Sequence, residues 1–386
     1  MKKKDPDISL TYLNSASTSW PKAPCVLEAV QSAMHAAPAY WPGILEDAHA
    51  ASCAFFGITD PSRFMFTGGC TQALSLALGD YPWHEGDVIL ISSLEHHALS
   101  RAVIKAAHER GVMYYQVPYK PGNPFDLEFA EEVLKEGKVR MIATTMASNV
   151  TGEMLPYKEI VELAHRYGAH CLLDAAQTAG LLPLDVDELG ADIFVFAGHK
   201  GPTAPHGVGG FYLAQDVALN SPAAMCEFVP GQTGKRSCSD IPGYCDIGSV
   251  NLSAVAGLSA GVKWLKAKGM DQLRAVSVAL TQTLIDGLIQ LEGVRVLGGL
   301  DAGKRTSAVS VVFDDWHVSD IEKRLLDDYG IVARAGFHCA PMAHEVLGTS
   351  EGGTLRFSTG PFSTADDINV LLNAMSEILA DTRVSK

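Results

Sequence analysis

Three features of the sequence could carry chemistry. Two are charged residues, Lys200 and Asp174, at or just after the ends of apolar, strand-like runs, and the third is a glycine-rich stretch at the start of a helix-like segment. Lys200 comes three residues after the run at 191–197, and Asp174 closes the run at 169–174. The glycine-rich stretch, "FTGGCTQALSLAL", covers 66–78. A lysine amine can bond covalently to a carbonyl carbon, a buried carboxylate needs a cation, and free N–H groups at a helix start bind phosphate.

Each of the three motifs also has an ordinary structural interpretation. Lys200 could be a solvated loop residue, Asp174 an N-cap, and the glycine pair a tight turn. The glycine motif lacks a following GK[ST], which disfavours a nucleoside triphosphate. Taken together, the phosphate cup, the buried acid and the lysine one strand later meet the requirements for binding pyridoxal 5′-phosphate.

These residues need a scaffold, and the chain alternates short apolar runs with helix-period segments. Strands are expected at 87–92, 112–117, 139–145, 169–174 and 192–198, with helices at 98–111, 126–137 and 157–168 between them. This alternation predicts an α/β fold with a mostly parallel sheet, in which ligands bind beyond the carboxyl ends of the strands.

The pattern changes after residue 250. Two long helices lead into strands at 306–313, 331–336 and 353–359, with helices at 318–329 and 364–381. We therefore expect three parts, namely an N-terminal segment (1–20) that joins a small domain, a large cofactor-binding domain (21–265), and a small α+β domain (266–386).

Composition and charge exclude several classes of protein. The 386 residues carry a formal net charge of -14 and show no basic stripe, which argues against nucleic-acid binding. No apolar stretch of about 18 residues is present, so no membrane span is expected. "MKKK" is not followed by an apolar run, so we expect no secretory signal and a cytoplasmic location. The eight cysteines form no CxxC, which argues against a zinc ribbon or a disulfide scaffold.

Seven motifs in one order give the chain a resemblance to a known family. They are "YLNSAST", "FTGGCTQALSLA", "EHHAL", "SNVTGEMLP", "LLDAAQTAG", "AGHKG" and "RAGFHCAP". From about residue 10 to 380 the chain resembles the class V aminotransferases of fold type I, and within them the cysteine desulfurases that have a short loop before the cysteine. The resemblance implies a seven-stranded sheet, bound pyridoxal 5′-phosphate and a homodimer.

The resemblance also implies roles for the matching residues. Lys200 would hold the cofactor covalently, Asp174 would pair with the ring nitrogen, and Gln177 would bond the phenolic oxygen. His96 would stack on the ring and serve as an acid–base group near neutral pH. Phosphate ligands would be Gly69, Cys70, Thr71 and His199, with Ser249 reaching the partner subunit's phosphate. The substrate carboxylate would be bound by Asn149 and Arg356.

Cys339 is the residue that separates the subclasses. In the family the equivalent cysteine attacks the substrate sulfur, becomes a persulfide, releases alanine and passes the sulfur to an acceptor. Arg334 and His338 are close in sequence, and we expect them to stabilise the nucleophilic thiolate. The side chains of the other seven cysteines are expected only to pack in the interior. Of these seven residues, Cys70 alone has a further expected role, which is phosphate binding through its backbone.

The chain departs from the family pattern in four places. Ala197 stands where relatives have a serine, and Asn14-Ser15 stands where they have Asp-Asn or Asp-Ser. The segment 37–50 lacks the Arg- and His-containing stretch that relatives contribute near the dimer interface. His206 is additional and has no assigned role. These departures leave substrate choice and the partner's contribution open.

Three alternatives stay open beside a cysteine desulfurase acting on L-cysteine. On the same fold the chain could be a selenocysteine lyase, a C–S lyase for another thiol amino acid, or an epimerase. A metal-dependent hydrolase using the histidines and Cys339 lacks an HExxH motif, so no metal is expected. A sulfur-relay protein with an inactive site is disfavoured by the intact set of Lys200, Asp174, Gln177 and Cys339.

Overall fold

A seven-stranded sheet forms the centre of the chain. The computed structural model describes residues 10–220 and 250–381. The sheet order is β2(Phe64–Thr67), β8(Gly209–Leu213), β7(Ile193–Ala197), β6(His170–Asp174), β5(Val139–Thr145), β3(Val88–Ser92) and β4(Met113–Val117). Strands β7, β6, β5, β3 and β4 run parallel, and β8 is antiparallel to both of its neighbours. The mostly parallel seven-stranded sheet is confirmed.

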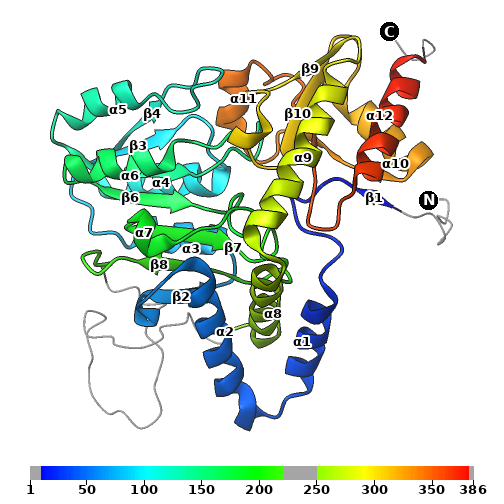
Figure 1. Cartoon of the computed structure of the whole chain (residues 1–386). Helices are drawn as coiled ribbons and strands as arrows, with labels where there is room; N and C mark the ends of the chain where they lie inside the picture. The colour runs from blue at the N-terminus through cyan, green and yellow to red at the C-terminus, as the bar shows by residue number, and fades with distance from the viewer. Residues whose placement is uncertain (1–9, 221–249, 382–386) are drawn as a thin grey trace.

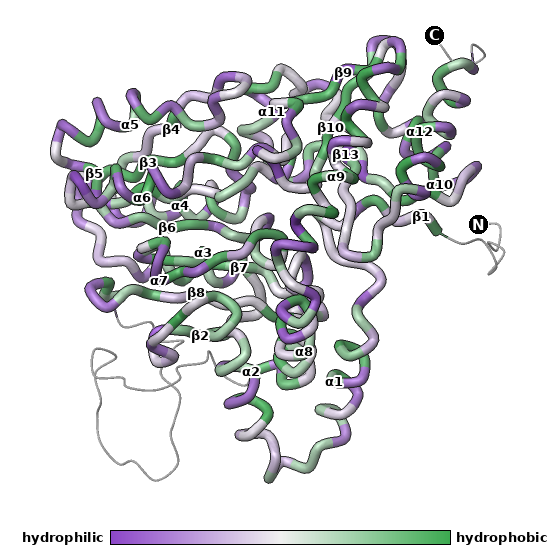
Figure 2. Tube along the Cα trace, viewed as in Figure 1, coloured by the Kyte–Doolittle hydropathy of each residue, from purple (hydrophilic) through white to green (hydrophobic). Residues whose placement is uncertain are grey.

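Helices cover both faces of this sheet, which explains why its strands other than the edge strand β4 are buried along almost their whole length. On one face α3(Cys70–Gly79) and α4(His97–Arg110) bury Leu74 and Leu99 against the sheet. On the other, α2(Trp41–Phe56), α5(Leu127–Leu134), α6(Tyr157–Arg166) and α8(Leu252–Lys268) complete a second core. Figure 2 shows hydrophobic residues along the central strands and hydrophilic ones on outward helical turns.

A second, smaller sheet lies beside the first (Figure 1). It has the order β12(Arg334–Gly336), β13(Thr354–Ser358), β10(Ala308–Phe313), β9(Val294–Val296). Helices α9(Met270–Leu288), α10(Val318–Tyr329) and α12(Ala365–Leu379) pack against it around Val309, Leu355 and Phe357. The strand β1(Thr11–Tyr12) pairs in parallel with β11(Ile331–Val332) in a separate two-stranded sheet, and the nearby Asn14 forms a bridge to Ser358 of β13.

The strand and helix pattern matches the expected elements, but several further elements were not expected from the sequence. Helices α1(Pro24–His35) and α2 pack on α8 and were not expected from the sequence. Strand β2 was also not foreseen. Short helices α7(Val186–Leu189) and α11(Pro341–Leu347) complete the described elements, with 3-10 turns at Pro38–Tyr40, Pro61–Arg63 and Ala302–Lys304.

The expected domain boundary at 265 falls inside α8. Helix α8 packs on α1 and α2, whereas α9 packs on α12 and β9. Gly269 separates the two helices and has a φ of 84°, a conformation that favours glycine. We propose Gly269 as the point where the large domain ends and the small domain begins.

Candidate functional site

A cavity of about 630 Å³ opens where the carboxyl ends of β5, β6 and β7 face the small sheet. The large domain contributes the ends of these strands and the starts of α3 and α4. The small sheet contributes Arg334 and Arg356, and the loop after β12 contributes His338. The expected site residues that line this cavity are Gly69, Cys70, Thr71, His96, Asn149, Asp174, Gln177, His199, Lys200, Arg334 and Arg356.

Asp174 provides a buried negative charge at the end of β6. Its side chain is 3% exposed, and its Oδ1 accepts hydrogen bonds from Ala176 N (2.8 Å) and Cys70 Sγ (3.3 Å). Burial raises the pKa of Asp174, and the nearby Lys200 ammonium opposes that rise. A carboxylate in this setting is stabilised by a cationic N–H, which a protonated pyridine ring supplies.

Lys200 follows β7 and reaches the same cavity. Burial lowers the pKa of its amine, while the negative charge of Asp174 counteracts part of that effect. The neutral amine is the nucleophilic form that can bond to a carbonyl carbon. Lys200 and Asp174 therefore line the same cavity, as the binding of pyridoxal phosphate requires.

The start of α3 forms a cup lined by backbone N–H groups. The N-cap is Gly69, which has a φ of 145° and no side-chain cap, so the first amides of the helix are free for a ligand. A Cβ on Gly209 would lie 2.5 Å from Phe196 O and 2.8 Å from Gly69 Cα, so only glycine lets β8 pass this close. Together with the hydroxyl of Thr71, this cup suits a phosphate group.

His199 lies at the edge of the phosphate cup. Its Nδ1 is buried and has no hydrogen-bond partner among the described residues. Burial and Lys200 lower the pKa of His199 to about 3. Its ring stacks on His206 with centroids 4.3 Å apart. The unpartnered Nδ1 of His199 suits a hydrogen bond to a phosphate. His206, to which the sequence assigned no role, packs against this candidate phosphate ligand.

His96 caps α4 and contacts the same space. Its Nδ1 accepts a hydrogen bond from Ala98 N at 3.1 Å, so the proton of the neutral ring is on Nε2. Burial, Lys200 and neighbouring cations lower the pKa of His96 to about 3. The expectation of a histidine titrating near neutral pH is wrong for the chain without cofactor, because that expectation used the value of a solvated ring.

Cys339 lies beside His96 in a strained loop. His338 and Cys339 both have positive φ values, 48° and 59°, which non-glycine residues rarely adopt. Hydrogen bonds hold the loop, from Asn149 Nδ2 to His338 O (2.7 Å) and from His97 N to Cys339 O (2.7 Å). A ring nitrogen of His96, one of His97 and Cys339 Sγ all lie within 4.8 Å of one another.

Only one of the two groups expected to stabilise the thiolate contacts the sulfur of Cys339. Arg334 Nη2 lies 3.9 Å from Cys339 Sγ. His338 instead contacts Thr354 through Nε2, 2.8 Å from the hydroxyl, and burial lowers its pKa to about 2. His338 is therefore neutral and turned toward β13, and the expectation that it stabilises the thiolate is wrong.

Arg356 and Arg334 form a cationic pair without an acidic partner among the residues that the structure describes. Arg356 is 1% exposed and donates to Asn149 O (2.6 Å) and to Ser17 Oγ (2.8 Å). Arg334 also donates to Ser17 Oγ, at 3.1 Å. Burial and Arg334 lower the pKa of Arg356 to about 9. This arrangement suits a carboxylate ligand.

The N-terminal segment completes the site, and its contribution was missed. Gln177 Nε2 donates to Ala16 O at 3.1 Å, and Ser17 is the shared acceptor for both arginines. The motif "YLNSAST" marks this segment in the sequence. It does not predict that Ser17 contacts Arg334 and Arg356, which lie more than 300 positions further along the chain. Ser249, expected to reach a partner subunit, lies outside the described residues.

Comparison with known proteins gives the family. The aminotransferase class-V profile matches residues 11–371. The chain belongs to the aminotransferase class-V family. It is 31% identical to a probable cysteine desulfurase of Halalkalibacterium halodurans over 95% of this chain and 93% of that one. It is also 31% identical to a probable cysteine desulfurase of Mycolicibacterium paratuberculosis, over 90% of this chain. The chain spans about half (51%) of the length of that relative.

Solved structures agree with this membership. The cysteine desulfurase CsdA of Escherichia coli is 28% identical, with a TM-score of 0.85 over 96% of this chain and 94% of that one. The cysteine desulfurase of Thermococcus onnurineus NA1 is 25% identical with a TM-score of 0.86, over the same shares of the two chains. The cystine C–S lyase C-DES is 22% identical with a TM-score of 0.81, over 96% of this chain and 98% of that one, a likeness that shows the fold alone. The expected family and the fold type I architecture are confirmed.

Proposed function

We propose that the protein is a pyridoxal-phosphate-dependent cysteine desulfurase. It converts L-cysteine to L-alanine and leaves the sulfur as a persulfide on Cys339. The observation that carries this proposal is the position of the thiol, since Cys339 Sγ lies within 4.8 Å of a ring nitrogen of His96, and His96 lines the cavity together with Lys200 and Asp174. The probable cysteine desulfurase of Halalkalibacterium halodurans, 93% of which is covered by this chain, supports the same activity.

The residues present fit pyridoxal phosphate. Asp174 would hold the proton on the ring nitrogen, Gln177 would donate to the phenolic oxygen, and Lys200 would bind covalently. The phosphate ligands would be the N–H groups of Gly69 and Cys70, the Thr71 hydroxyl and His199. Bound there, the cofactor supplies an electron sink for bonds at the substrate's α-carbon.

The two arginines would fix the substrate. Arg356 is held by three partners from the N-terminal segment and Asn149, so its guanidinium is preorganised for the carboxylate of L-cysteine. Asn149 lines the same cavity, and the N–H of Nδ2 that does not bond His338 O would donate to the carboxylate. Binding the carboxylate here orients the substrate sulfur toward the Cys339 loop.

Lys200 would move the proton at the substrate's α-carbon, and His96 would act as a hydrogen-bond donor. The lowered pKa of Lys200 makes Nζ a base for that proton. His96, with a pKa of about 3, is neutral, so its Nε2–H would donate a hydrogen bond to the substrate while Nδ1 stays fixed on Ala98 N. The fold therefore orients the His96 ring before substrate binds.

Sulfur transfer takes place at Cys339. The thiolate Sγ attacks the substrate sulfur, forming an S–S bond while the C–S bond breaks. The electron pair of that bond goes to carbon, which takes a proton and leaves as alanine. Arg334 stabilises the attacking thiolate from 3.9 Å. A thiol of an acceptor protein then removes the persulfide sulfur.

Alanine release by two variants tests this proposal. Cys339→Ala should abolish alanine formation from L-cysteine and keep cofactor binding. The matched control is Cys25→Ala, a partly buried thiol in α1. A Cys339→Ala enzyme that still forms products would favour the alternative candidates, a selenocysteine lyase, a C–S lyase or an epimerase, since these need no thiol nucleophile.

We propose a homodimer as the working form, located in the cytoplasm. Leu27, Met34, Tyr40 and Trp41 are exposed on α1, α2 and the turn between them, which project from the sheet (Figure 1). Large apolar side chains gathered in this way favour burial by a second copy. No described helix is long and apolar enough to span a membrane.

A further inference from the structure

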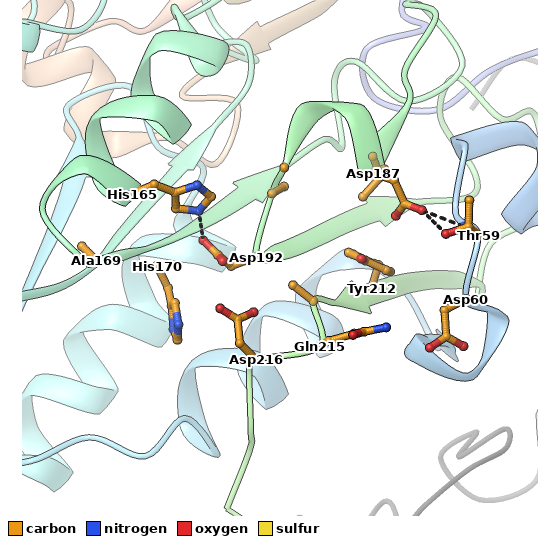
Figure 3. Close-up of a pocket in the computed structure, with 15 residues that line it drawn as sticks. Thr59, Asp60, His165, Ala169, His170, Asp187, Asp192, Tyr212, Gln215 and Asp216 are labelled. Carbon is orange, nitrogen blue, oxygen red and sulfur yellow. Dashed lines mark hydrogen bonds and ion pairs between the residues drawn. The ribbon is translucent and has the colours of Figure 1, made fainter.

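A second cavity lies at the opposite end of the central strands from the cofactor site. It measures about 570 Å³ and is lined by the residues that precede or begin β6 and β7 and by those that follow β8 (Figure 3). His170 begins β6 and Asp192 immediately precedes β7, whereas Asp174 and Ala197 close the same strands at the cofactor site. The two cavities are therefore separated by the length of the sheet.

This second cavity carries a negative charge. Its lining includes four carboxylates and two imidazoles, contributed by Asp60, Asp187, Asp192, Asp216, His165 and His170. No lysine or arginine is among the lining residues. A concave surface with charge of one sign concentrates counter-ions, here cations.

Three of these side chains have the spacing of a metal site. One ligand atom each of His170, Asp192 and Asp216 lies within 4.8 Å of the other two. Figure 3 shows the three side chains gathered at one side of the cavity. Asp216 is exposed, so its side chain has room to adjust toward a divalent ion, whose ligands lie at about 2.1 Å.

The two inner ligands are held in place by their neighbours. Asp192 is 4% exposed, and its Oδ2 accepts from Cys171 N (2.5 Å) and pairs with His165 Nε2 (2.8 Å), which leaves Oδ1 for a ligand. His170 Nδ1 is 2.7 Å from the hydroxyl of the buried Tyr81. Such a partner on one imidazole nitrogen orients the other nitrogen for a metal.

The described residues contain one other group with this spacing, and its charge is unfavourable. His96, His97 and Cys339 lie equally close together, but Arg334 contacts the thiol and Lys200 is nearby. These cations repel a metal ion. The acidic cavity attracts one, and its imidazole and carboxylate donors suit Mn²⁺ or Zn²⁺ more than Ca²⁺.

We propose that His170, Asp192 and Asp216 bind one divalent transition-metal ion. The ion connects the starts of β6 and β7 to the segment after β8, so it stabilises the large domain without taking part in sulfur transfer. The site is independent of the proposed activity, and either one can fail alone.

Mn²⁺ is the probe for this site, because it binds cysteine thiolates poorly and so avoids Cys339. The full-length, cofactor-loaded protein is titrated while electron paramagnetic resonance follows free Mn²⁺. We expect one ion bound per chain and a higher melting temperature with Mn²⁺. Asp216→Asn and His170→Ala should each weaken binding about 10–100-fold.

Asp60→Asn is the matched control, since Asp60 lines the same cavity outside the cluster. It should leave Mn²⁺ affinity within about twofold, and alanine formation should be unchanged in all three variants. Asp216 is exposed, so its variant decides the question even where His170→Ala fails to fold. Absence of saturable binding at millimolar Mn²⁺, or equal affinity in Asp216→Asn and Asp60→Asn, overturns the proposal.

Discussion

At the scale of single residues, the site depends on charges that have lost their ordinary solvation. Lys200, Arg356 and His96 all have lowered pKa values because the fold buries them beside one another. Asp174 is the one carboxylate that faces them from the end of β6. An incoming carboxylate or phosphate therefore meets positive charge and N–H donors that need no rearrangement.

Replacing Arg356 by lysine tests the arginine pair. Lysine cannot reproduce the forked contacts to Asn149 O and Ser17 Oγ while also binding a carboxylate. We expect kcat/KM for L-cysteine to fall about 10–100-fold, mostly through KM. Steady-state alanine formation measures this effect. Arg295→Lys, an exposed change in the same domain, serves as the control, and an equal loss in both variants would contradict the assignment.

At the scale of elements, the close approach of β8 to the start of α3 shapes the phosphate cup. Gly209 pairs with Ala197 on one side and with Thr67 on the other, two residues before Gly69. No side chain fits between these backbones, because a methyl group added at Gly209 would lie 2.5 Å from Phe196 O. The cup is therefore built by strand pairing as much as by the glycine motif.

Gly209→Ala should damage both stability and cofactor binding. The added methyl displaces β8 or the Gly69 turn, at a cost of about 1–3 kcal/mol in the free energy of unfolding. Urea unfolding and the dissociation constant of pyridoxal phosphate measure the two effects. In Gly43→Ala the new methyl meets no atom within 4 Å inside α2, so that variant should gain about 0.5–1 kcal/mol. Parallel behaviour of the two variants would refute this account of the cup.

At the scale of the whole molecule, buried titratable groups make stability depend on pH. His338 has a pKa of about 2 when folded, far below its unfolded value, so the unfolded chain binds more protons as the pH falls below about 6.5. Burial of His338 thus costs about 2 kcal/mol of stability at pH 5 relative to pH 7. Glu95 acts in the opposite direction, because burial raises its pKa to about 7 and its folded form gains stability on acidification.

Glu95→Gln separates these opposing contributions. Glu95 accepts from Ser92 Oγ, Thr144 Oγ1 and Thr145 N, and glutamine keeps an oxygen for these donors. His96 and His199, which have pKa values of about 3, lose stability on acidification as His338 does, so the wild-type chain without cofactor should lose stability between pH 7 and pH 5. The variant should lose about 2 kcal/mol more. Urea denaturation at the two pH values measures the difference. If the stability of Glu95→Gln depends on pH less than that of the wild type, the contribution assigned to Glu95 has the wrong sign.

The sequence predicted the parts of the fold whose signals are local. Apolar runs bounded by glycine located the central strands within one or two residues, and those strand ends brought Asp174 and Lys200 together. Helix α1 buries only Val26 and Ala33, and the segment from Pro38 in the turn to Pro42 in the first turn of α2 breaks the pattern, so no clear period revealed the two helices. The role of Ser17 and the direction of His338 depend on contacts across the domains, which no local pattern encodes.

The central claim is that sulfur moves from L-cysteine onto Cys339. The most direct measurement is peptide mass spectrometry after a single turnover of the cofactor-loaded protein without any thiol acceptor. We expect one added sulfur on the peptide that contains Cys339, in an amount equal to the alanine formed. Free sulfide together with an unmodified Cys339 peptide would contradict the account.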